Sequence, residues 1–418
     1  MNEIRSRGHI RRNRGHVAIV LHAHLPYVRR RGTDERVEEQ WLYEALWESY
    51  LPLLEVLEGV GAGPGSLDPC LTLSLSPTLL SMLADPHHRS GFEAFAESLR
   101  DTCVRAEEDA ALSPAVAAHR ARLDRSVSRG GGAGRDLPGA FAEIANAGRI
   151  ELMTTAATHA YLPTLLAPAA ARAQLRIGRR YFSQITGRAA SGLWLPECGY
   201  DERLGPEIAR AGVRFAVLEE HGLDLARPRP GCVPFRPIAS PDGVAYFGRA
   251  ADLVGLVWSR SRGYPGHAGY REFHRDLSEL RPDLLPPGWV GPTGARPLAV
   301  GGSEKKEIYD PGLGRRLAVS HAAELVQHVD DAMSAAGCAD PIAVLAFDAE
   351  LFGHWWWEGP AFLAEVLSLL GDRAISLSAY LDRDPELLIA EPATSSWGEG
   401  GFAGVWTQPA AAHAIRTG

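Results

Sequence analysis

The amino-acid sequence predicts an α/β protein built as a βα barrel. Short apolar runs typical of buried strands alternate with segments of helical periodicity, a pattern that indicates a largely parallel sheet. Several of these runs end in histidines, carboxylates or tryptophans. Polar and aromatic side chains at successive strand ends are typical of a barrel whose carboxyl-terminal rim is the active site.

Eight short runs predict the strands. In residues 16–21 every position after His16 is apolar, and several are β-branched. Residues 70–77 alternate Leu with Thr and Ser, as expected for a barrel strand with small interior residues. In chain order, the predicted strands are 16–21, 70–77, 149–154, 194–197, 215–218, 244–247, 253–258 and 342–347.

Segments of helical spacing lie between these strands. In residues 38–59 the apolar positions recur every three or four residues, and Gly59 ends this pattern. Gly212 caps the predicted helix 201–211. The predicted helices are 38–59, 78–128, 168–185, 201–211, 318–335 and 360–370. The helical stretch from 78, with the glycine-rich run 130–134, predicts a helical subdomain inserted at about 78–148.

Composition narrows the classes of function. The 418 residues can bury a large core. The formal net charge of −8 argues against a nucleic-acid partner, because nucleic acids are themselves negatively charged. We find neither a signal-peptide core nor an apolar run approaching the ~18 residues that span a bilayer, so we expect no membrane association. Five widely spaced cysteines form no CxxC pair. We therefore expect no disulfide framework and a cytoplasmic location.

Two carboxylates follow strand ends beside tryptophans. Asp348 comes directly after the strand 342–347 and precedes three consecutive tryptophans that begin at Trp355. Glu197 follows Trp194 and Pro196, and the proline opposes continuation of the strand. Sugar rings stack on aromatic side chains, and glycosidic bonds break between paired carboxylates. The sequence therefore predicts a sugar-cleaving site in which these two acids converge.

Histidines mark two further strand ends. His22 and His24 lie two residues apart at the end of the first strand, so they can point into one site, and His159 follows the third strand. We favour imidazoles that donate to sugar hydroxyls or to a catalytic carboxylate. Metal ligation and core histidines bonded to backbone carbonyls stay as alternatives. We expect Glu350 to support Asp348 rather than to act as the acid.

Long strings in this sequence resemble a known family. His-Ala-His-Leu-Pro-Tyr-Val at 22–28, Trp-Leu-Pro-Glu-Cys-Gly-Tyr at 194–200 and Asp-Ala-Glu-Leu-Phe-Gly-His-Trp-Trp at 348–356 resemble the conserved regions of glycoside hydrolase family 57, and more narrowly its 1,4-α-glucan branching enzymes. The resemblance implies a (β/α)7 barrel over residues 1–390 and the start of a C-terminal helical region at 391–418. It also implies a metal-independent retaining mechanism, no cofactor, and an α-1,4-glucan such as glycogen or amylose as substrate.

The resemblance also assigns roles by position. Glu197 matches the nucleophile and Asp348 the general acid/base. The residues that match the cleavage subsite are His22, His24, His159 and His354. Those that match the aromatic glucan platforms are Trp41, Trp258, Trp397 and Trp406. We add Trp355, from the tryptophan triplet, to the expected substrate-binding residues.

The assigned roles carry chemical expectations. Glu197 should have a low pKa, kept there by cationic or donor neighbours. Asp348 should hold a proton at neutral pH beside an apolar wall of Trp355 and Trp356. In a retaining enzyme the two carboxyl groups should lie ~5–5.5 Å apart.

Other functions stay open at this point. The loop 227–233 lacks the tyrosine that branching members carry there, so an α-amylase or 4-α-glucanotransferase of the same family is the first alternative. A metal-dependent carbohydrate deacetylase would use His22 and His24 on a related barrel. A glucan-binding protein without activity is the last alternative.

Overall fold

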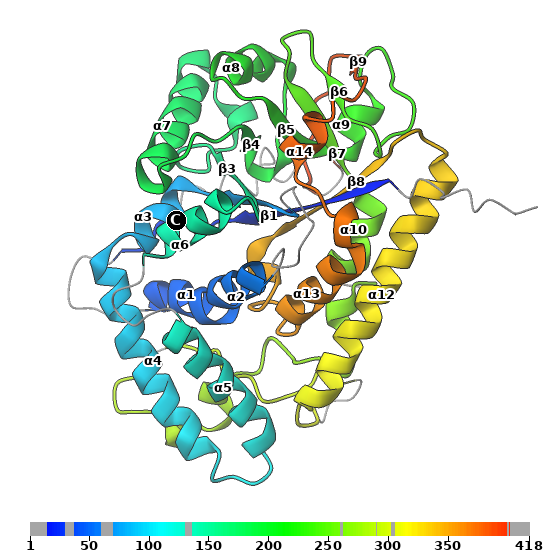
Figure 1. Cartoon of the computed structure of the whole chain (residues 1–418). Helices are drawn as coiled ribbons and strands as arrows, with labels where there is room; N and C mark the ends of the chain where they lie inside the picture. The colour runs from blue at the N-terminus through cyan, green and yellow to red at the C-terminus, as the bar shows by residue number, and fades with distance from the viewer. Residues whose placement is uncertain are drawn as a thin grey trace, which may run out of the picture.

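Seven parallel strands close into a barrel (Figure 1). The computed structural model describes residues 15–29, 37–59, 70–129, 136–259, 262–289, 291–301, 306–398 and 401. The barrel strands are β1 (His16–Ala23), β2 (Thr72–Leu75), β3 (Glu151–Thr155), β4 (Gly192–Trp194), β5 (Phe215–Glu219), β7 (Ala245–Arg249) and β8 (Ile342–Asp348). Each pairs in parallel with the next, and β8 pairs with β1, which closes the ring. The predicted (β/α)7 barrel is confirmed.

The strand register sets the level of the rim. His22 on β1 stands opposite Asp348 on β8 and opposite Ser74 on β2. Parallel strands present their carboxyl ends at one face of the barrel, so these three residues share a level there. The final residues of the strands therefore bring distant parts of the sequence to a common site.

Alternate strand residues face two different cores. Ala18 and Val20 pack with Val344 and Ala346 inside the barrel. Ile19 on the same strand packs with the surrounding helices instead. This alternation is what the two-residue period of a strand produces when both faces are buried, and it explains why residues 17–21 of β1 are all apolar.

Helices surround the barrel. In chain order they are α1 (Val37–Ala45), a π-helical turn (Leu46–Tyr50), α2 (Leu51–Gly59), α3 (Pro77–Leu83), α4 (Pro86–Ala106), α5 (Ser113–Arg129), α6 (Leu137–Asn146), α7 (Pro168–Thr186), α8 (Gly205–Arg210), α9 (Glu220–Asp224), α10 (Ala251–Trp258), α11 (Leu277–Leu280), α12 (Pro311–Ala336), α13 (Gly359–Leu370) and α14 (Leu377–Leu381). Among these described helices, none combines the length and apolar character needed to cross a bilayer.

Helices α3 to α6 connect β2 to β3. Of these, α4 and α5 pack against each other and extend away from the barrel at the bottom of Figure 1. We propose that these helices form the inserted subdomain expected at about 78–148. The glycine-rich run 130–134 lies outside the described residues.

The prediction of a strand at 253–258 is wrong. These residues belong to the helix α10, whose buried side chains are Leu253, Val254 and Val257. That spacing of one and four residues is helical, but a six-residue apolar run shows no clear period by itself. The sixth barrel strand, β7, corresponds to the strand predicted at 244–247 and lies directly before this helix, and the seventh is β8. Two short strands, β6 (Ile238–Ala239) and β9 (Leu388–Ile389), extend the sheet outside the ring.

Contrary to the expectation of no disulfide framework, one pair of cysteines is bonded. Cys232, in the loop before β6, is bonded to Cys338, just beyond α12, across 106 residues of sequence. Cys70, Cys103 and Cys198 are buried free thiols. The long separation explains the error, because spacing along the chain does not reveal which loops the barrel brings together.

Candidate active site

A cleft of about 1160 Å³ opens at the carboxyl ends of the barrel strands. It brings together every predicted site residue within the described part of the chain. These residues are His22, His24, Trp41, His159, Glu197, Trp258, Asp348, His354, Trp355 and Trp397. Trp406 lies outside the described residues.

Glu197 lies in a tight turn just after β4. Its backbone is left-handed, with φ 60° and ψ 24°, a conformation that is unusual for a residue with a side chain. The segment Ser396–Trp397 holds this turn: the Ser396 hydroxyl (3.0 Å) and the Trp397 backbone N–H (3.1 Å) both donate to the Glu197 carbonyl. The Trp397 indole N–H donates to the carboxylate, at 2.8 Å. These hydrogen bonds hold both the backbone of Glu197 and one oxygen of its carboxylate in place.

The prediction of a low pKa for Glu197 is wrong in direction. Burial raises the pKa of Glu197, and the hydrogen bond from Trp397 only partly opposes it. Arg249 also lines the cleft, but it forms an ion pair with Glu219, at 3.2 Å. Among the described residues, the carboxylate of Glu197 therefore has the neutral Trp397 indole as its donor, and not the expected cation.

Asp348 ends β8 and lines the cleft. Burial raises the pKa of Asp348 to about 7, and the negative charge of Glu197 is the second cause of this increase. The positive charge of Arg249 acts in the opposite direction and lowers the pKa. The expected protonation is thus supported, but through burial and the second acid. Of the two tryptophans expected as its wall, Trp355 is exposed on the rim and Trp356 is buried in the core.

Three histidines form a stacked cluster in the cleft. The Nε2 atoms of His22 and His159 are 2.9 Å apart, and the rings of His24 and His159 stack at 3.8 Å. Hydroxyl groups hold the other nitrogens: Ser74 bonds His22 at 3.0 Å and Ser76 bonds His24 at 2.9 Å. This confirms that His22 and His24 point into one site.

Burial keeps these rings uncharged. It lowers the pKa of His24 to about 4 and that of His159 to about 3, and it lowers the pKa of His22 well below its usual range, helped by the two neighbouring histidines. Neutral imidazoles can both donate and accept hydrogen bonds. The cluster therefore suits a neutral, hydroxyl-rich ligand.

Glu350 lies two residues after Asp348 and is a buried residue that also lines the cleft. Its carboxyl group accepts hydrogen bonds from the His24 backbone N–H, at 3.1 Å, and from the Tyr50 hydroxyl. Burial and the charge of Asp348 raise the pKa of Glu350 to about 8. Tyr50 was missed by sequence reasoning, because its place in an apolar helical pattern resembles that of any core tyrosine.

His354 is attached to a buried network of charges. Its Nδ1 lies 2.5 Å from Glu48 Oε2, and Arg296 contacts Glu48 at 3.0 Å and Glu44 at 2.8 Å. Burial alone would raise the pKa of Glu48, but Arg296, then His354 and Arg271, hold it below its ordinary value. An anionic Glu48 fixes the His354 ring in the cleft.

Three tryptophans form an exposed rim. Trp41, Trp258 and Trp355 are 49%, 48% and 51% exposed, although large aromatic residues are usually more buried. Trp355 stacks on Phe273, with centroids 4.6 Å apart. Exposed indoles around a cleft provide flat apolar surfaces for the C–H faces of sugar rings.

The chain matches a family model, and it is similar in sequence and in structure to several proteins. The model of glycosyl hydrolase family 57 matches residues 18–383. A probable 1,4-α-glucan branching enzyme of Mycobacterium tuberculosis is 32% identical over 94% of this chain and 76% of its own length. The branching enzyme structure from Pyrococcus horikoshii is 30% identical with a TM-score of 0.83, covering 95% of this chain and 76% of that one. An α-amylase structure from Thermotoga maritima is 31% identical with a TM-score of 0.84, covering 92% and 78%.

Proposed function

The chain belongs to glycosyl hydrolase family 57, and from this we propose that it is a 1,4-α-glucan branching enzyme. Its substrate would be an α-1,4-glucan such as glycogen or amylose, and its product a glucan with new α-1,6 branches. The observation that carries the proposal is the shared cleft of Glu197 and Asp348, rimmed by exposed tryptophans.

We propose a retaining mechanism in two steps. Asp348 donates its proton to the glycosidic oxygen while the Glu197 carboxylate attacks the anomeric carbon, so the C–O bond breaks and a glycosyl ester forms on Glu197. The pKa of about 7 for Asp348 supports its role as the acid near neutral pH. The expected carboxyl separation of ~5–5.5 Å stays a prediction.

The second step transfers the glucan. The 6-hydroxyl of an acceptor glucan attacks the anomeric carbon, the ester bond to Glu197 breaks, and the hydroxyl proton goes to the Asp348 carboxylate. Glu197 is then a carboxylate again and Asp348 a protonated acid. We assign His22, His24, His159 and His354 to the sugar hydroxyls at the cleavage point. We assign Trp41, Trp258, Trp355 and Trp397 to sugar stacking, with Trp397 also holding Glu197.

Linkage analysis of amylose after incubation tests this function. The proposal predicts new α-1,6 linkages with little increase in reducing ends. Reducing ends without branch points would contradict it and establish hydrolysis instead, as in the amylase that shares this fold. A Glu197→Gln variant should form neither product, which separates the reaction from a contaminating activity.

We also propose that the protein is cytoplasmic and that it takes part in glycogen synthesis. Three buried free thiols are compatible with a reducing compartment. The Cys232–Cys338 disulfide favours an oxidising one. Thiol counting on the protein from its native host decides between them.

A further inference from the structure

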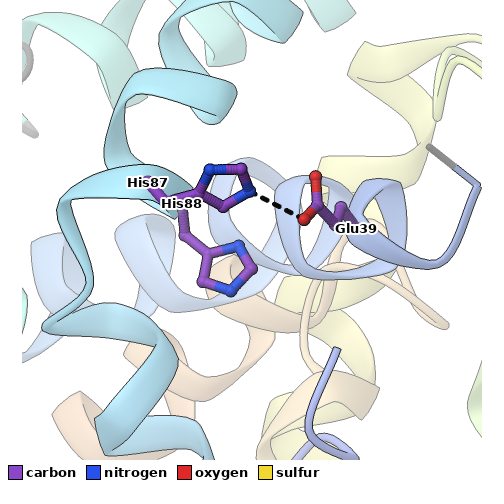
Figure 2. Close-up of side chains that lie close together, drawn as sticks. All are labelled: Glu39, His87 and His88. Atoms are coloured by element: carbon purple, nitrogen blue, oxygen red, sulfur yellow. Dashed lines mark hydrogen bonds and ion pairs between the residues drawn. The ribbon is translucent and has the colours of Figure 1, made fainter. Parts of the chain in front are cut away.

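A cluster of metal-binding side chains lies away from the cleft, between α1 and the first turn of α4. Figure 2 shows its members: Glu39 from α1, and His87 and His88 from α4. His87 Nε2 lies 2.8 Å from Glu39 Oε1. One ligand atom from each of the three side chains lies within 4.8 Å of the others. Two imidazoles and a carboxylate are the side chains that zinc sites use most often together with cysteine.

His88 provides a second, independent observation. Its residue is only 1% exposed, and neither of its ring nitrogens has a hydrogen-bond partner within the described residues. A neutral imidazole has one donor and one acceptor nitrogen, and buried polar atoms are seldom left without partners. A metal ion would engage one of these nitrogens as a ligand.

The charges around the cluster permit a cation. Within the described residues, Arg29 is a positive charge that acts on His88, and it is paired with Asp85 at 3.0 Å. Glu39 is almost completely buried, and its second oxygen accepts a hydrogen bond from Tyr43, at 3.5 Å. The carboxylate of Glu39 therefore brings a negative charge to the cluster, as a cation site requires.

We propose that Glu39, His87 and His88 bind a divalent transition-metal ion of the zinc class. Ligand atoms of a tetrahedral zinc site lie about 3.3 Å apart, given metal–ligand distances near 2.0–2.2 Å. The ligand atoms of the three side chains lie between 2.8 Å and at most 4.8 Å apart, a range that includes this value. Small movements of the side chains would therefore bring the three ligand atoms to the distances that zinc requires. His87, whose side chain is 44% exposed, lies on the solvent side and leaves a path for the ion and a water ligand.

The position of the site gives the ion a structural role. It would join α1 to α4, two helices from separate parts of the barrel connections. The helix α1 also carries Trp41 and Glu44, which line the cleft. The ion would therefore attach the inserted helices to one wall of the cleft, at a distance from the reacting carboxylates.

Zinc binding by the full chain tests this inference. Protein stripped with a chelator is incubated with zinc sulfate and desalted, and its zinc content and Tm are measured. We expect about one zinc per chain and a Tm increase of about 2 °C or more. His87→Ala should weaken zinc binding at least about tenfold and remove the Tm increase. Because His87 is partly exposed, its truncation leaves no core cavity.

His328→Ala is the matched control. His328 is a half-exposed histidine on α12 that pairs with Glu324 at 3.5 Å, much as His87 pairs with Glu39, but it belongs to no such cluster within the described residues. This variant should bind zinc as the original protein does. Equal zinc content and equal Tm increase in the original protein and in His87→Ala would overturn the proposal, as would no binding in either. Neither result bears on branching activity, which is assayed separately.

Discussion

At the scale of single residues, the candidate acids depend on what surrounds them. Both side chains are half-buried and line the cleft, and this partial burial raises the pKa of each. Asp348 is raised further by the charge of Glu197. Two nearby carboxyl groups favour a state with one proton between them, in which Glu197 is ionised and Asp348 is protonated.

This state predicts a bell-shaped pH profile for kcat/KM. Asp348 must be protonated, so activity should fall as the pH rises through about 7. Glu197 must be ionised, so activity should also fall at acidic pH, with a midpoint above that of an ordinary glutamate because its pKa is raised. Branch formation measured between pH 4 and 9 checks both limbs, and a constant rate from pH 6 to 9 would argue against Asp348 as the acid.

The Trp397 indole should set the acidic limb. In Trp397→Phe the carboxylate loses the hydrogen bond that opposes its raised pKa. The acidic limb should move to higher pH and kcat/KM should fall by about 10–100-fold, the cost of a lost charge-assisted hydrogen bond in a buried site. Trp258→Phe, a change on the exposed rim, should leave the limb in place. An unchanged limb in both variants would refute the role of Trp397.

Local sequence identified the site residues but not their electrostatics. Glu197 and Asp348 could be found because each follows a strand beside tryptophan. The pKa of Glu197 was predicted in the wrong direction because it depends on burial and on Trp397, two hundred residues away. Glu48 and Tyr50 were missed because their contacts with His354 and Glu350 join segments about 300 residues apart.

At the scale of secondary-structure elements, the π-helical turn between α1 and α2 carries buried polar side chains that contact the cleft residues His354 and Glu350. Glu48 and Tyr50 both belong to it, and both are almost completely buried. The predicted helix 38–59 is observed over nearly its whole length, interrupted by this turn. Such turns often occur at functional sites.

Removal of the Glu48 charge should destabilise this element. In Glu48→Gln, Arg296 and Arg271 lose a buried anionic partner, so the free energy of unfolding should fall by about 3 kcal/mol. Urea denaturation measures the loss. Glu38→Gln, an exposed change at the start of α1, should have no effect. Equal stability of the original protein and Glu48→Gln would show that the network contributes nothing.

Element type was predictable where a long pattern existed. The helix α12 was found from its periodicity, although it begins seven residues earlier than predicted, at Pro311 after the cap Asp310. The six residues of the misassigned strand at 253–258 were too few to show a period. Their helical state depends on which face packs against the barrel.

At the scale of the whole molecule, the fold gathers distant segments twice. Closure of β8 onto β1 places Asp348 opposite His22. The disulfide joins Cys232 to Cys338 outside the barrel. The barrel was predictable because alternation of strands and helices runs along most of the chain, whereas the disulfide depends on loops whose approach no local pattern shows.

The disulfide predicts three free thiols among five cysteines. Thiol titration of the denatured, unreduced protein counts them. Cys232→Ser should lower the free energy of unfolding by about 2–4 kcal/mol, because the bond closes a loop of roughly one hundred residues. A reducing agent should destabilise the original protein but not this variant. Five free thiols would contradict the bond.

Capture of the glycosyl-enzyme tests the central claim most directly. In Asp348→Asn, an activated donor such as α-maltosyl fluoride can still react, because fluoride leaves without an acid, but the acceptor is no longer activated. Mass spectrometry of a digest should then find the sugar on the peptide that contains Glu197, and none after Glu197→Gln is added. A sugar attached to any other residue, or no attachment while product still forms, would contradict the account.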